Sequence, residues 1–139
     1  MIQRQQTLWL LLAVACSVLS FLYPVYTGQR LGDNNIVIME ELMAGSNFFL
    51  LVLTGISVLA GAIAIFLFKD RKTQVKLTIA GIVIAILLFI LYFTEIKKFQ
   101  TGRFALTSIY MAGILIGYIM ATRGILKDEK LVKSLNKLR

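Results

Sequence analysis

The side chains that most often perform chemistry in proteins are scarce in this sequence. It has no His and a single Cys, Cys16, so the usual proton shuttle and the usual transition-metal ligands are missing. Hydroxyl groups do occur in the apolar stretches, but none has a base near it in the sequence, and we expect them to hydrogen-bond between helices. These hydroxyl residues are Ser17, Ser20, Thr54, Ser57 and Ser108. We therefore expect no catalytic site, no cofactor and no metal, and predict a non-enzymatic protein.

Glu95 is the one acidic residue that lies beside an apolar stretch, and Lys98 follows it three residues later. Residues at this spacing face each other on a helix, which predicts an ion pair at the edge of a membrane. A proton-coupled exporter needs a carboxylate at membrane depth instead. The position of Glu95 therefore disfavours transport by that mechanism.

Four apolar stretches predict membrane-spanning helices. Of the 139 residues, 58% are hydrophobic and 16% charged, whereas soluble domains carry about a quarter of charged residues. About 20 apolar residues cross a bilayer as a helix. The predicted spans cover residues 7–26, 48–68, 77–96 and 104–121, and the fourth continues into a helical tail over 122–139. The expected fold is all-α, a four-helix transmembrane bundle that forms a single domain over 1–139.

Two segments leave alternatives open. The tetrapeptide ending at Cys16 loosely resembles a lipoprotein cleavage site, but the apolar run continues beyond it, which favours a retained helix. The loop over 27–46 holds turn residues and the β-prone run Ile36–Met39. We expect a short strand or an interfacial turn there, with an edge strand that docks a partner as the alternative.

Small residues recur at four-residue spacing on every predicted span. In lipid, helices associate mainly by close backbone approach, which small residues permit. We interpret them as packing positions inside the chain's own bundle, with a seam for another subunit as the alternative. They are Ala13, Ser17, Ser57, Gly61, Gly81, Ala85, Gly113, Gly117 and Ala121.

Basic residues predict the orientation of the chain. With four spans both termini share one side, and all Lys and Arg residues except Arg30, Lys97, Lys98 and Arg103 lie on that side. The positive-inside rule places this side, with both termini, in the cytoplasm. The resulting cytoplasmic basic surface is predicted to contact anionic lipid headgroups. It comprises Lys69, Arg71, Lys72, Lys76, Arg123, Lys127, Lys130, Lys133, Lys137 and Arg139.

The basic tail is also amphipathic. Leu131, Leu135 and Leu138 fall on one helical face, and Glu129 and Lys133 are spaced for an i, i+4 ion pair. The tail can lie on headgroups or dock its leucines on a cytoplasmic partner. Nucleic acid is the least favoured partner, because no aromatic residue is available to stack on bases.

Three short stretches resemble an uncharacterised family of small four-helix inner-membrane proteins of the Bacteroidota, the domain of unknown function four-two-nine-three. They are Met1 to Arg4, Phe68 to Lys72 with Gln74, and Ile125 with the run Lys127 to Ser134. The resemblance covers essentially the whole chain and implies a bacterial inner membrane and four helices, but no activity. The family usually ends in Asp-Arg-Leu-Arg, whereas this chain has Asn-Lys-Leu-Arg over 136–139.

These observations favour an accessory or structural subunit of a larger bacterial inner-membrane complex. Its helices would pack on other integral membrane subunits, and its basic surface would face the cytoplasm. The alternative is a small transporter or channel formed by self-association, for which hydroxyl residues would line a thin polar path.

Overall fold

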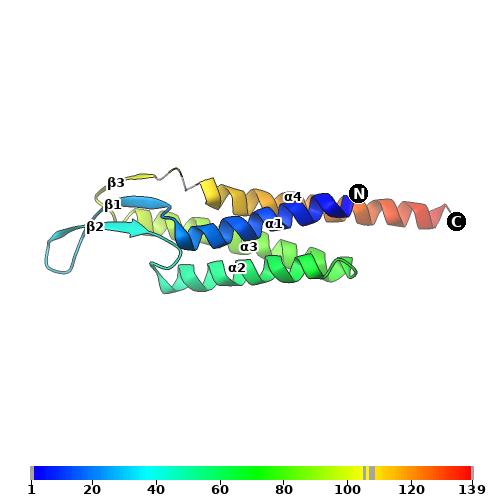
Figure 1. The fold of residues 1–139 in the computed structure, drawn as a ribbon, viewed down its shortest axis with the longest axis horizontal. Helices are drawn as coiled ribbons and strands as arrows, with labels where there is room; N and C mark the ends of the chain where they lie inside the picture. Colours follow the sequence, from blue (N-terminus) through cyan, green and yellow to red (C-terminus); the bar gives the residue numbers. More distant parts are fainter. Residues whose placement is uncertain (1, 105, 107–108, 139) are drawn as a thin grey trace.

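The structure, a computed structural model, describes residues 2–104, 106 and 109–138. Four long helices lie side by side, and a small sheet covers one end of them (Figure 1). Helix α1 packs on α2 and α4, and α3 packs on the same two helices. The helices are α1 (Ile2–Leu22), α2 (Phe48–Phe66), α3 (Arg71–Ile96) and α4 (Ile109–Lys137).

All four helices are long and apolar enough to cross a membrane. Their outward faces carry large apolar side chains, such as Leu59 and Phe66 on α2, which are 62% and 81% exposed. Their interior holds small and polar residues, including Ser17 and Ser57, which are fully buried. A soluble protein would bury the apolar residues and expose the polar ones. The arrangement is compatible with a multi-pass membrane protein.

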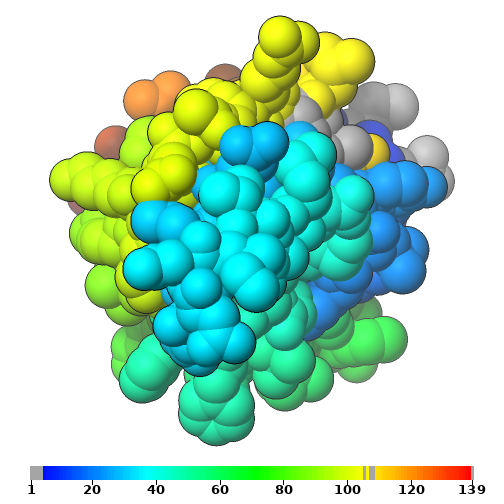
Figure 2. Space-filling view, turned by 90° about the vertical axis from the view of Figure 1, so that its left-hand side faces the viewer, coloured from blue at the N-terminus to red at the C-terminus, as the bar shows by residue number. Residues whose placement is uncertain are grey.

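The sheet has three antiparallel strands in the order β2–β1–β3. Tyr26 of the central strand pairs with Leu42 on one side and with Phe104 on the other. The β1–β2 hairpin lies over the centre of the helix ends (Figure 2). The strands are β1 (Tyr26–Leu31), β2 (Val37–Leu42) and β3 (Thr101–Phe104). The prediction of a purely α-helical fold was therefore incomplete. The strand expected in the first loop is one of two that form there.

Helix α1 ends four residues before the predicted end of the first span at residue 26. Pro24 has no backbone N–H and disfavours helical geometry at the residue before it, so the helix stops at Leu22. Tyr26 instead begins strand β1. The apolar residues after Pro24 were therefore wrongly assigned to the helix.

Helix α4 begins at Ile109, and not at Phe104 as the prediction had it. Phe104 is the last residue of β3, and its ring packs edge-on against the ring of Tyr26 with centroids 5.2 Å apart. A short apolar run fits a strand as well as a helix, and pairing with β1 decides between them here. At its other end α4 continues without a break to Lys137, as predicted.

The helical part of the third span is longer than its apolar part. Helix α3 begins at Arg71, because the carboxylate of Asp70 accepts a hydrogen bond from the backbone N–H of Thr73 and caps the helix. The prediction from hydropathy began this span at residue 77, because hydropathy detects the apolar residues of a helix and not the residue at which the helix begins. Helix α2 likewise ends at Phe66, two residues before its predicted end.

Candidate interaction surfaces and buried polar groups

The two ends of the helices differ, and we name them for what they carry. The sheet end carries β1, β2 and β3. The terminal end carries the start of α1, the turn between α2 and α3, and the last turns of α4, which extend beyond the other helices (Figure 1).

The small residues of α4 lie against α1. A Cβ atom added to Gly117 would lie 2.9 Å from the Cβ of Ala13, and one added to Gly113 would lie 2.6 Å from the Sγ of Cys16. Ala121 is fully buried in the same cluster. The small-residue stripe of α4 thus brings α1 close within this chain, and its contacts leave no room there for another subunit's helix.

Tyr118 of α4 occupies the centre of the helices. A Cβ atom added to Gly81 of α3 would lie 2.5 Å from its ring, and one added to Gly61 of α2 would lie 3.0 Å from its hydroxyl. The Tyr118 hydroxyl donates to the backbone carbonyl of Ser57, and Ser57 also hydrogen-bonds Ser17 at 3.2 Å. Ala85 is buried in the same cluster.

Sequence reasoning identified the small residues but missed Tyr118, which fills the space they leave. A signal was present, since Tyr118 stands next to Gly117 in the middle of an apolar helix. A hydroxyl at that depth needs a hydrogen-bond partner, which points to the helix interior.

The terminal end carries the predicted basic surface. Two ion pairs hold it together: Arg71 with Asp128 at 3.3 Å, which ties α3 to α4, and Lys133 with Glu129 at 3.1 Å. The second is the predicted i, i+4 pair, and it is confirmed. The other described cations of this surface are exposed, and Arg139 lies outside the described residues. An open groove of about 600 Å³ lies between the α2–α3 turn and α4.

The groove is of mixed charge. Its lining includes Lys69 and Lys72 but also Asp70, whose pKa is lowered by the hydrogen bonds from the Thr73 hydroxyl and backbone N–H. The lowered pKa keeps Asp70 ionised at neutral pH, next to the cations. The positive charge of the terminal end is therefore partly neutralised where the chain folds against itself.

The last turns of α4, together with Leu138 directly after its end, form what we call the α4 extension, residues 128–138. Gln6, near the start of α1, donates a hydrogen bond to the carbonyl of Gly124 at 2.9 Å, so the extension lies beyond the reach of α1. Its leucines are Leu131, Leu135 and Leu138, exposed by 43%, 64% and 85%. At helical spacing they continue the same face of α4 that packs on α1. The extension thus presents an apolar stripe that becomes more exposed toward its end, among the side chains that the structure describes.

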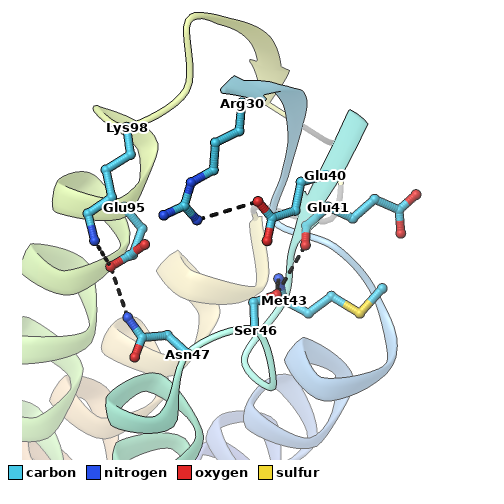
Figure 3. Close-up of polar contacts among 8 residues, drawn as sticks. All are labelled: Arg30, Glu40, Glu41, Met43, Ser46, Asn47, Glu95 and Lys98. Atoms are coloured by element: carbon cyan, nitrogen blue, oxygen red, sulfur yellow. Dashed lines mark hydrogen bonds and ion pairs between the residues drawn. The ribbon is translucent and has the colours of Figure 1, made fainter. Parts of the chain in front are cut away.

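The sheet end holds a cluster of polar contacts (Figure 3). Glu95, at the end of α3, is 7% exposed and accepts hydrogen bonds from Lys98 at 2.8 Å and from Asn47 at 2.9 Å. The predicted Glu95–Lys98 pair is confirmed. Asn47 also caps α2, because its side-chain oxygen Oδ1 accepts a hydrogen bond from the backbone N–H of Phe49. These contacts join the ends of two helices.

The hairpin has its own polar contact, and the first half of its strand β2 is apolar. Arg30 pairs with Glu40 at 3.4 Å across β1 and β2, a weak contact between exposed side chains (Figure 3). Val37, Ile38 and Met39 of the edge strand β2 are all more than half exposed. The partner-docking edge strand stays a prediction, and β2 has both a free edge and apolar side chains for it.

Buried polar residues form a series along the helix interior, from Gln6 and Gln74 near the terminal end to Glu95 at the sheet end. Most have partners: the Gln74 amide donates to the carbonyl of Ala64 at 2.9 Å, for example. Such bonds satisfy polar groups that lipid and apolar side chains cannot. Across the described residues no group of His, Cys, Asp and Glu side chains could hold a metal ion.

The comparison with known families identifies the chain. Residues 2–138 match the sequence model of the family described as "Domain of unknown function (DUF4293)". This protein belongs to that family, as its sequence motifs suggested. Neither the curated proteins nor the solved structures include a detectable relative.

Proposed function

We propose that this protein is a non-enzymatic accessory subunit of a larger bacterial inner-membrane complex, and that the α4 extension is its contact with the partner. The observation that carries the proposal is the leucine stripe of Leu131, Leu135 and Leu138, which is 43%, 64% and 85% exposed among the side chains that the structure describes. Exposed apolar stripes on a rigid helix are typical of helix-in-groove or helix–helix recognition.

The direction of the α4 extension favours a protein over a lipid partner. The extension continues α4 along the long axis of the molecule (Figure 1). In a spanning helix, Leu135 would stand about 18 Å beyond Arg123, the first cation after the apolar part of α4. The interfacial layer on each side of a bilayer is only roughly 5–8 Å thick. The leucines would stand clear of the lipid, so a partner helix is the occupant that fits them.

Charge favours a partner with acidic flanks. Lys133 lies on the face opposite the leucines, Lys130 and Lys137 lie on the flank between, and Lys127 lies beside the stripe. A second copy of the same extension would bring like charges together, whereas an acidic amphipathic helix would be attracted. The base of the extension is held in place by the Arg71–Asp128 pair, which limits the ordering that binding requires.

The proposed orientation places the terminal end, with both termini, in the cytoplasm. Lys69, Lys72, Lys76 and Arg123 are exposed there, close to where the helices would leave the membrane. Cations in such positions contact anionic headgroups, each contributing about 1 kcal/mol near the surface. Headgroup contact and partner docking would thus use different parts of the terminal end.

Native purification tests this proposal. The protein, tagged at its N-terminus, is isolated from native membranes in mild detergent, and co-purifying proteins are quantified by mass spectrometry. We expect one membrane or membrane-associated partner in near-equal amount. It should be lost when Leu131, Leu135 and Leu138 are changed to Ser, and only weakened when Lys130, Lys133 and Lys137 are changed to Ser, because the lysines contribute charge attraction and not the apolar contact. Recovery of the protein alone, as a monodisperse species, would refute the proposal.

A self-associating transporter or channel is the second candidate, and the series of buried polar side chains favours it. Such side chains inside membrane helices often mark a path for ions or substrates. Flux of protons, ions and small solutes in proteoliposomes tests this candidate. Flux that is abolished by Ser57→Val would support a transporter or channel. Proteoliposomes that stay impermeable to all of these solutes would rule this candidate out.

A further inference from the structure

Two buried hydroxyl groups have no hydrogen-bond partner. They are those of Thr54 on α2 and Tyr92 on α3, and both residues are 1% exposed. An unpaired hydroxyl away from water costs free energy, and such groups in native proteins are normally paired with protein or with ordered water. These two require an explanation.

Helical spacing from neighbouring contacts sets both hydroxyls near the level of the Ser20 hydroxyl on α1. Ser17 contacts Ser57, and one turn further toward the sheet end the antiparallel helices place Ser20 opposite Thr54. Tyr92 lies one turn from Glu95, and the side chains of α3 tilt toward its N-terminus, so the Tyr92 hydroxyl reaches down to this level.

The Ser20 hydroxyl is close to that of Tyr92 but does not satisfy it. The two lie within interaction range, yet outside hydrogen-bonding geometry. Ser20 donates its own proton to the backbone carbonyl of Ser17 at 2.6 Å. The Ser20 hydroxyl oxygen can still accept a hydrogen bond, because a hydroxyl has two lone pairs. Helical geometry therefore brings three hydroxyls from three helices to one level, with two donors and several lone pairs unused.

We propose that Ser20, Thr54 and Tyr92 hold one buried water molecule between α1, α2 and α3. A buried water typically makes about three hydrogen bonds to otherwise unsatisfied groups, and three hydroxyls meet that requirement. A cation is a poorer fit, because Ca²⁺ and Mg²⁺ sites draw on carboxylate ligands and none of the three residues supplies one. This inference does not depend on the proposed function.

The water would connect two polar groups that the chain leaves separate. On one side lie Ser17, Ser57 and Tyr118 in the centre of the helices. On the other lies the buried Glu95, one turn from Tyr92. With the water in place, hydrogen-bonding groups extend from the middle of the helices to the sheet end.

Isosteric substitutions test the water by the sign of their effect. If the hydroxyls are satisfied through a water, Thr54→Val and Tyr92→Phe each remove a hydrogen bond, and each should lower the unfolding midpoint by roughly 3–6 °C. If the site is dry, both substitutions remove only an unpaired group and should leave the midpoint unchanged or raise it. That result would overturn the proposal.

Two further variants sharpen the test. Thr78→Val is the matched control, because Thr78 is as buried as Thr54 but donates to the carbonyl of Val75 in its own helix. The effect of Thr54→Val should exceed that of the control. The Thr54→Val/Tyr92→Phe double variant should lose less than the sum of the two single losses, because one water serves both groups. Full additivity, or no excess over Thr78→Val, would contradict a shared water.

Direct observation completes the test. An experimental structure at a resolution that reveals ordered water should show a peak within hydrogen-bonding distance of the Thr54 and Tyr92 hydroxyls. A direct bond between the two hydroxyls, or an empty gap, would overturn the proposal.

Discussion

Single glycines set the distances between these helices. Gly81 receives the ring of Tyr118 so closely that a Cβ atom would lie 2.5 Å from it, whereas a Cβ atom at Gly55 would meet nothing within 4 Å. Both glycines lie well inside the length of a helix, away from its ends. They differ mainly in how much space surrounds a Cβ atom added to them. They therefore separate the cost of a clash from the general effect of replacing glycine.

We expect Gly81→Ala to destabilise the protein by about 1–3 kcal/mol, because the added methyl group overpacks a site filled by an aromatic ring. Gly55→Ala should be neutral or stabilising, since it meets open space and improves helix propensity. Thermal unfolding can be followed with a thiol-reactive fluorophore, because Cys16 is the only Cys and is buried. Equal unfolding midpoints for the two variants would contradict the packing described.

A second residue-level prediction concerns Asp70 and pH. Its pKa is lowered by hydrogen bonds from Thr73 that form only in the folded state. A lowered pKa means that the carboxylate stabilises the fold at neutral pH, and that this contribution is lost as the pH falls through the folded-state value.

Asp70→Ala should therefore lower the unfolding midpoint at pH 7, and the difference from the wild type should shrink in acid. Asp70→Asn is the matched control, because it keeps a side-chain oxygen for capping but no charge to titrate. Its own midpoint should lie between those of the other two proteins at pH 7. A difference between wild type and Asp70→Ala that is constant with pH would show that the ionised cap contributes nothing.

At the scale of elements, the sheet joins parts of the chain that are far apart in sequence. Strand β3 follows α3, yet it pairs with β1, which follows α1. The contact depends on two facing glycines: a Cβ atom on Gly28 would lie 2.4 Å from the carbonyl oxygen of Thr101, and one on Gly102 would lie 2.5 Å from the ring of Tyr26. The sheet thereby ties the segment between α3 and α4 to the segment between α1 and α2.

We expect Gly28→Val to separate β3 from β1 while leaving the helices folded. Hydrogen exchange measured by mass spectrometry should show lost protection over 101–104 and unchanged protection in α2. Gly45→Val is the control, because Gly45 lies between β2 and α2 at the same sheet end, and a Cβ atom there would meet nothing within 4 Å. Loss of protection in the helices as well would mean that the sheet is required for their packing.

The sequence predicted the helices better than the sheet, for physical reasons. A spanning helix needs some twenty apolar residues, so α2 and α3 stand out from composition alone. Strand β3 has four residues, all exposed, and its pairing with β1 depends on contacts between loops that no local pattern encodes. The same holds for the interior: the small residues were visible in sequence, whereas their common neighbour Tyr118 required the fold.

At the scale of the whole molecule, the large apolar side chains exposed along the helices are compatible with a multi-pass membrane protein, and the molecule has two unlike ends. The terminal end extends into a charged helix with an exposed apolar stripe, and the sheet end closes with a small sheet (Figures 1 and 2). We interpret the first as the cytoplasmic side and the main contact surface.

The proposed orientation predicts which side of the membrane each end occupies. In a Cys16→Ala background, Asp33→Cys at the hairpin turn should react with a membrane-impermeant maleimide added outside the inner membrane, as in spheroplasts. Lys130→Cys should react only after the membrane is opened. Labelling of Lys130→Cys in intact spheroplasts would reverse the orientation.

The most direct test of the account is photo-crosslinking of the α4 extension in living cells. A photoreactive amino acid replaces Leu135 on the apolar stripe or, as the control, Lys133 on the opposite face. We predict a discrete protein adduct from position 135, with one partner identified by mass spectrometry, and none from position 133. Adducts with lipid alone, or no adduct at position 135, would contradict the claim that this stripe binds a partner helix.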